Sequence, residues 1–198
     1  MNSPTHSLLA LALLSKKGEP KRNWIVLFGS LLPDVAIYLW APYQRYVNGA
    51  SRTEMWRDLY FQPPMQNLIA LFNSIPIYLA LAVVGWLMRG KIWGKLLLFF
   101  ALAALVHMAT DMPVHSEDAY RHFWPLSDWR FHSPLSYWNS SHHSRWVSLF
   151  ETFLALTCIG VLWRRFPQIW VKITLGLLAL LYITFQVMMI MARLQVSS

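Results

Sequence analysis

Long apolar runs separated by short basic or polar segments dominate the pattern along this chain. Five of them come close to the ~20 residues that a helix needs to cross the hydrocarbon core of a bilayer. They cover residues 24–40, 67–88, 92–110, 147–163 and 169–191. The run at 7–14 is too short to cross, and predicts a half-depth helix with His6 at its start and Ser3 or Thr5 as its cap. We therefore expect an all-α, polytopic transmembrane helical bundle of about five spans plus an N-terminal half-helix.

Composition favours a single integral membrane domain over residues 1–198. The chain is 56% hydrophobic and only 13% charged, which is too apolar for a soluble domain of this length. Its net charge of +8 would by itself suggest nucleic-acid binding. The basic residues, however, mostly sit in short segments between the apolar runs, where they set membrane orientation, so we expect no nucleic-acid partner. The single cysteine, Cys158, lies inside an apolar run, so the sequence predicts neither an intrachain disulfide nor a thiolate metal site.

The distribution of lysine predicts the orientation of the chain in a bacterial inner membrane. Every lysine falls in residues 15–23, 89–95 or 164–172, three short segments that the predicted spans place on one side. Short loops rich in lysine and arginine stay in the cytoplasm. The long polar segment 112–146 is therefore expected to face the periplasm.

Ionisable side chains gather at the outward ends of the predicted spans. Asp34 lies in the outer half of the first span, His107 and Asp111 end the third, and Glu151 stands in the first turn of the fourth. His6 begins the half-helix on the same side. Ionisable groups at membrane depth are expensive, so a functional site is the default interpretation of this convergence.

Imidazole and carboxylate groups in this arrangement point to a divalent metal, with zinc as the first choice and manganese or iron as alternatives. A dication would also offset the desolvation of the carboxylates. The predicted ligands are His6, Asp34, His107 and Asp111, with His115 or Glu151 completing the shell. In the alternative interpretation His107 and Asp111 hydrogen-bond locally, and Glu151 caps the start of its helix, where a negative charge is favourable.

Six of the seven histidines lie in residues 107–143, among several aromatic residues and arginines. Taken singly, the loop histidines beyond residue 111 are interpreted as interfacial residues, and Trp and Tyr as interfacial anchors. A second interpretation gives some of these residues a chemical role. Arginines clamp phosphates bidentately, and a carboxyl or imidazole group can protonate a leaving oxygen. The candidate catalytic residues are Asp118, His122 and Arg130.

Several motifs in residues 1–135 resemble the YdjM-type family of predicted membrane-bound metal-dependent hydrolases. They are His6, Gly29-Ser-Leu-Leu-Pro-Asp34, Phe72-Asn-Ser-Ile, His107-x-x-x-Asp111 and Pro-Leu-Ser-Asp-x-Arg-Phe at 125–131. Family members often have His-Ser where this chain has Asn73-Ser74, which puts a ligand or substrate contact there in question. The set His107, Asp111 and His115 is also distantly similar to zinc-dependent phospholipases C and related single-strand nucleases, which implies phosphoester hydrolysis.

Two functions stay open at this level. The first is a metal-dependent hydrolase that acts on a phospholipid or lipid-linked phosphoester at the outer face of the inner membrane. The second is a non-catalytic membrane scaffold or complex subunit, whose metal or polar cluster holds the outer loop as a docking surface. The chain has no Gly-rich phosphate loop and no Gly-x-Ser-x-Gly motif, so nucleotide-driven and serine-hydrolase chemistry lack support. The oligomeric state does not follow from the sequence.

Overall fold

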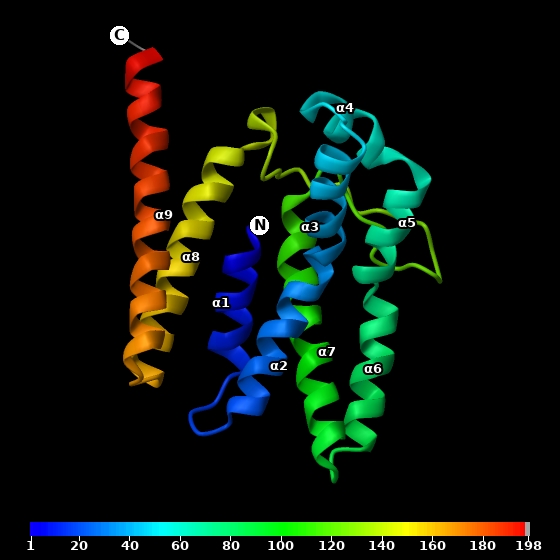
Figure 1. Ribbon diagram of the computed structural model, residues 1–198, viewed down its shortest axis with the longest axis vertical. Coiled ribbons are helices and arrows are strands. Elements are labelled where there is room, and N and C mark those ends of the chain that lie inside the picture. The colour runs from blue at the N-terminus through cyan, green and yellow to red at the C-terminus, as the bar shows by residue number, and fades with distance from the viewer. Residues whose placement is uncertain (197–198) are drawn as a thin grey trace.

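The computed structural model describes residues 1–196, and this part of the chain is a bundle of helices without a strand (Figure 1). Five helical stretches are long and apolar enough to cross a membrane, which makes this a multi-pass membrane protein. They are Pro20–Val47, Pro63–Leu87, Ile92–Val114, Ser144–Arg165 and Ile169–Ala192. The predicted fold class, with five spans and a short N-terminal helix, is therefore confirmed.

The first two spans are interrupted helices. The first consists of α2 (Pro20–Leu31), a 3-10 turn (Leu32–Asp34), α3 (Val35–Pro42) and a π-helical end (Tyr43–Val47). The second consists of α5 (Pro63–Phe72) and α6 (Ile75–Leu87), and the Ser74 hydroxyl between them caps α6 by accepting the Ile77 amide. The Asn73 side-chain amide donates to the Pro33 carbonyl at 3.0 Å, so the two interruptions lie against each other.

The remaining spans are continuous helices: α7 (Ile92–Asp111), α8 (Ser144–Arg165) and α9 (Ile169–Val196). The shorter pieces are α4 (Arg52–Arg57) and 3-10 turns at Leu59–Phe61, Met112–Val114 and Ser140–His142. Because α8 begins at Ser144, Glu151 lies two turns inside the helix. The prediction of Glu151 in the first turn is therefore wrong, since the helix starts before its apolar stretch does.

Helix α1 (Ser3–Leu14) is short and stands between α8 and α2, packing against both and against α7 (Figure 1). The Arg165 guanidinium closes its C-terminal end by donating to the carbonyls of Leu11, Ala12 and Ser15. At its other end Asn2 occupies the N-cap position without a side-chain cap bond. The predicted cap by Ser3 or Thr5 is wrong, because their hydroxyls bind carboxylates of other helices, as described below.

Glycine lets the helices approach closely at Gly29 and at Gly85. A Cβ on Gly29 in α2 would press into the carbonyl oxygen of Phe100 in α7, and one on Gly85 would lie 2.5 Å from the Leu98 backbone nitrogen. Gly160 in α8, in contrast, has open space around its missing Cβ.

We predict that Gly29→Ala and Gly85→Ala each destabilise the folded protein by about 1–3 kcal/mol, because backbone atoms cannot yield to the added methyl group. The matched control Gly160→Ala should leave stability unchanged or raise it by up to ~1 kcal/mol through helix propensity. Thermal unfolding in detergent measures all three variants. Equal melting of Gly29→Ala and Gly160→Ala would contradict this packing.

Candidate metal centre

The metal-centre candidates meet in the interior, at the C-terminal end of α7. His107 and Asp111 project from one face of that helix and are 0% and 2% exposed. His6 arrives from α1 and stacks on His107, with the ring centroids 3.7 Å apart. One ligand atom from each of these three residues lies within 4.8 Å of the other two. Asp34, at the interruption of the first span, lies beside them with Oδ1 3.5 Å from His107 Nε2. The structure thus brings the four predicted ligands together.

The hydrogen-bond network assigns the tautomer of His107. Its Nδ1 lies 2.7 Å from the carbonyl oxygen of Ser30, which can only accept, so Nδ1 carries a proton. In the neutral ring Nε2 then presents a lone pair. That buried atom has no hydrogen-bond partner anywhere in residues 1–196, although the Asp34 carboxylate stands nearby.

Both ring nitrogens of His6 have partners. Its Nδ1 lies 3.0 Å from the hydroxyl of Thr110, which is also within hydrogen-bond distance of the Val106 and His107 carbonyls. Its Nε2 lies 3.2 Å from Asp111 Oδ1. Two imidazole Nε2 atoms thus face two carboxylates, and a proton or a metal ion between the atoms of each pair makes the contact favourable.

Two pairs of these atoms are spaced as metal ligands are. Ligand atoms about 2.0 Å from a tetrahedral zinc are about 3.3 Å from one another. The pairs His6 Nε2–Asp111 Oδ1 and His107 Nε2–Asp34 Oδ1 are 3.2 and 3.5 Å apart, and the ligand atoms of His6, His107 and Asp111 lie within 4.8 Å of one another. The amino group of Met1 lies 2.8 Å from the same Asp111 oxygen, so a metal here would share or replace that contact.

His115 and Asp118 extend the cluster. His115 Nε2 lies 3.1 Å from Asp111 Oδ1, and its Nδ1 lies 2.7 Å from Asp118 Oδ2. Burial lowers the pKa of His115, but the two carboxylates outweigh it and raise the pKa to about 9. Asp118, a candidate catalytic residue, therefore holds the His115 ring in place, as carboxylates do for metal-bound histidines.

His122 and Asn73 lie at the interruption of the second span. His122 Nδ1 lies 3.1 Å from the Asn73 carbonyl, the Ile75 amide donates to the His122 carbonyl at 2.8 Å, and Ser74 donates to Trp124. These bonds fasten the loop that follows α7 to the helix break. His122 Nε2 and Asn73 Oδ1 are buried without a hydrogen-bond partner among the described residues. Burial lowers the pKa of His122, which keeps its ring neutral.

Glu151 is buried but is not a member of the three-residue ligand group. Its Oε1 accepts the Asn2 amide and the Thr5 hydroxyl, each at 2.7 Å. It therefore fixes the start of α1, the helix that carries His6. No sequence pattern indicates this role, because it depends on two segments far apart in the chain.

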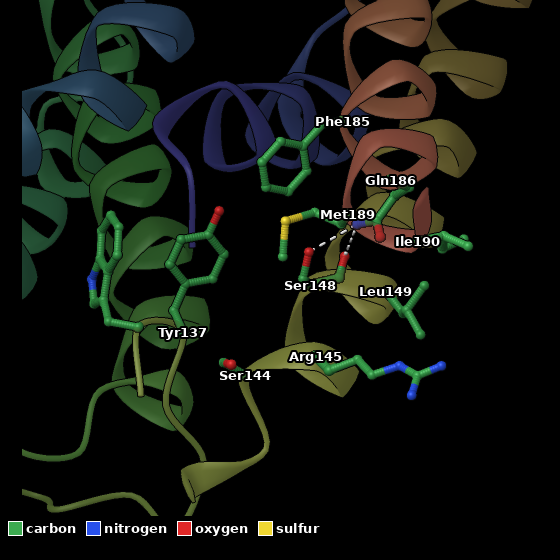
Figure 2. A pocket seen from close by; sticks show the side chains of 10 residues that line it. Tyr137, Ser144, Arg145, Ser148, Leu149, Phe185, Gln186, Met189 and Ile190 are labelled. Carbon is green, nitrogen blue, oxygen red and sulfur yellow. Dashed lines mark hydrogen bonds between the residues drawn. The ribbon is translucent and has the colours of Figure 1, made fainter. Parts of the chain in front are cut away.

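The arginines of the outer segment have partners of their own. Arg130 donates to Gln66 Oε1 at 3.1 Å and to the Ala119 carbonyl, and Arg121 pairs with Asp128 at 2.9 Å. A cavity of about 380 Å³ lies between α8, α9 and the loop residues Tyr137 and Trp138. The Arg145 side chain extends away from Tyr137 and Met189 (Figure 2). None of the predicted metal ligands lines this cavity. A role of Arg130 in catalysis stays a prediction.

His107→Ala and Asp111→Ala should each remove most of the bound metal, because each deletes a buried ligand of the candidate centre. Both variants should also melt at a lower temperature than the metal-loaded protein, since metal binding stabilises the native state. His132→Ala is the matched control, because His132 Nδ1 contacts the Ser116 carbonyl, 2.8 Å away. Elemental analysis and thermal melting test this; full metal content in both ligand variants would reject the centre.

The comparisons with known proteins leave the family of this chain open. The chain matches no protein-family model, no curated protein and no solved structure. The resemblance to YdjM-type hydrolases, and the more distant one to phospholipases C, thus stay predictions.

Proposed function

We propose that this protein is a metal-dependent hydrolase of the bacterial inner membrane that cleaves a phospholipid or lipid-linked phosphoester. The observation that carries the proposal is the buried group His6, His107 and Asp111, whose ligand atoms lie within 4.8 Å of one another, with the Asp34 carboxylate 3.5 Å from His107 Nε2. The motif resemblance to YdjM-type hydrolases supports the same class.

A divalent metal, zinc first, would be held by His6, Asp34, His107 and Asp111, with His115 hydrogen-bonded to Asp111 beside them, and would supply Lewis acidity toward a phosphoryl oxygen and water. A residue of the chain itself would transfer the protons of the reaction. His122 Nδ1 is committed to the Asn73 carbonyl, so the free Nε2 can take a proton from water and return it to the leaving oxygen. Asp118 acts as a positioning residue through His115.

A second candidate function, the non-catalytic scaffold, draws support from the depth of the cluster. His6 and His107 are 0% exposed, and Asp111 bonds to protein groups from two directions. A shell closed by protein alone is typical of structural metal sites, whereas catalytic sites keep one position open. Such a centre would tie α1, α2 and α7 together beneath the outer loop.

Turnover separates the two functions. Purified, metal-loaded protein incubated with phospholipids and polyprenyl phosphates should release products that mass spectrometry detects, and a chelator should abolish their release.

His122→Gln should lower turnover at least ~100-fold, the low end of a general acid–base contribution, with metal content unchanged. Arg130→Lys keeps the positive charge but loses the planar guanidinium that would bind phosphate. It should therefore lower turnover and leave the melting temperature unchanged. If no lipid yields a product although the protein holds its full metal content, the scaffold function is supported and the hydrolase is refuted.

The proposed site faces the periplasm. Ser140→Cys, in the outer loop, should react with a membrane-impermeant maleimide in intact cells, because the lysines cluster on the opposite side. Lys91→Cys, on an exposed position of the opposite loop, is the matched control and should react only after lysis. The native Cys158 is 4% exposed and should contribute little background. The reverse pattern would move the site to the cytoplasmic side.

A further inference from the structure

The loop that follows α7 turns back along the second span. Its residues 121–128, which we call the dipping loop, pass beside α5 to the break between α5 and α6 (Figure 1). The Ile75 amide donates to the His122 carbonyl at 2.8 Å, and the Ser74 hydroxyl donates to the Trp124 carbonyl. These bonds hold the middle of the dipping loop at the level of the helix break.

The helix break lies inside the stretch Pro63–Leu87, which is long and apolar enough to cross a membrane. Arg89 and Lys91 follow its end directly, and they put one boundary of the hydrocarbon near Leu87. From Leu87 back to Ile75, helix α6 rises about 18 Å. A hydrocarbon core of ~30 Å therefore continues about 10 Å past Ile75 before it reaches its other boundary. The middle of the dipping loop thus lies below the membrane surface.

The dipping loop is polar at its two ends and apolar between them. At the ends, Arg121 pairs with Asp128 at 2.9 Å and also donates to the Asn67 side chain at 2.6 Å. Asn67 lies on α5 about 12 Å from the helix break by helical rise, and so close to the membrane boundary. The tip at 123–126 reads Phe-Trp-Pro-Leu, and its Leu126 is 80% exposed. Polar groups thus stand at the boundary and apolar side chains below it.

The backbone of the tip is hydrogen-bonded as hydrocarbon requires. Lipid chains offer no hydrogen bonds, so irregular backbone at membrane depth must find its partners within the protein. The amides of Trp124, Leu126 and Ser127 donate to carbonyls within the dipping loop at 2.9 to 3.1 Å. Pro125 has no amide that needs an acceptor. The tip can therefore stand in lipid without leaving these donors unsatisfied.

We infer that the dipping loop is a re-entrant segment, whose tip contacts lipid acyl chains in the leaflet on the side where α7 ends. Lipid is the occupant because the tip continues the lipid-facing surface of the second span, on which Leu68 and Leu71 are 38% and 44% exposed. The Arg121–Asp128 pair then lies at the level of the lipid headgroups. The inference goes beyond the proposed function, and it adds that His122 belongs to a segment held by the membrane as well as by the protein.

The test is the accessibility of nitroxide spin labels, which needs no turnover. Each label is attached to one introduced cysteine in a Cys158→Ala background, in vesicles of phosphatidylethanolamine and phosphatidylglycerol. Oxygen concentrates in the hydrocarbon, whereas a nickel chelate, present on both sides, stays in water. The label at Leu126→Cys should collide more with oxygen than with the chelate, as should the control at Leu79→Cys, 51% exposed on α6. The label at Ser140→Cys, exposed before α8, should show the reverse order.

The outcomes separate this inference from the proposed function. An unchanged melting temperature shows that each labelled variant is folded, and Ser127→Cys, also exposed in the dipping loop, replaces Leu126→Cys if that variant is unstable. A tip label that collides mainly with the chelate would overturn the inference, because the tip would then stand in water. A tip label that neither reagent reaches would also overturn it, because a second copy or another protein would then cover the tip. Both results leave the hydrolase open, since product release tests it separately.

Discussion

Ionisable side chains among apolar helices must find their partners inside the protein, because hydrocarbon offers neither counter-charges nor hydrogen bonds. Here four such groups, His6, Asp34, His107 and Asp111, come from three segments and are packed within a few ångströms of one another. Removing any one of them would leave a buried charge or lone pair without compensation. The short helix α1, the interruption of the first span and the unbroken end of α7 are all arranged around that requirement.

The helix interruptions leave backbone carbonyls free to accept hydrogen bonds from side chains. A residue in the middle of an α-helix has its carbonyl engaged by the amide four residues on. Near the breaks, the carbonyls of Ser30 and Asn73 instead accept from His107 and His122, and this fixes which ring nitrogen stays free. The breaks also lie against each other through Asn73 and Pro33, so the two histidines belong to one connected network.

The loop that follows α7 adds to the cluster. It brings His115 to Asp111, with Asp118 on the other ring nitrogen, and it fastens His122 to the break of the second span. The buried ligand group is therefore held by this loop as well as by α1 and α7.

The sequence alone determined the helical class, the five spans and the one-turn spacing of His107 and Asp111, because apolar length and helical period are local properties. It also singled out His6 and Asp34, since an ionisable residue beside an apolar run is conspicuous wherever the chain folds. Only the tertiary structure decided the partners. Glu151 fixes α1 instead of capping α8, Asp118 holds His115, and Arg130 binds Gln66, because each contact joins side chains that sequence separation does not relate. How α9 packs on α8 is likewise decided only by the tertiary structure, because apolar helices with similar outer faces do not encode their neighbours in their hydropathy.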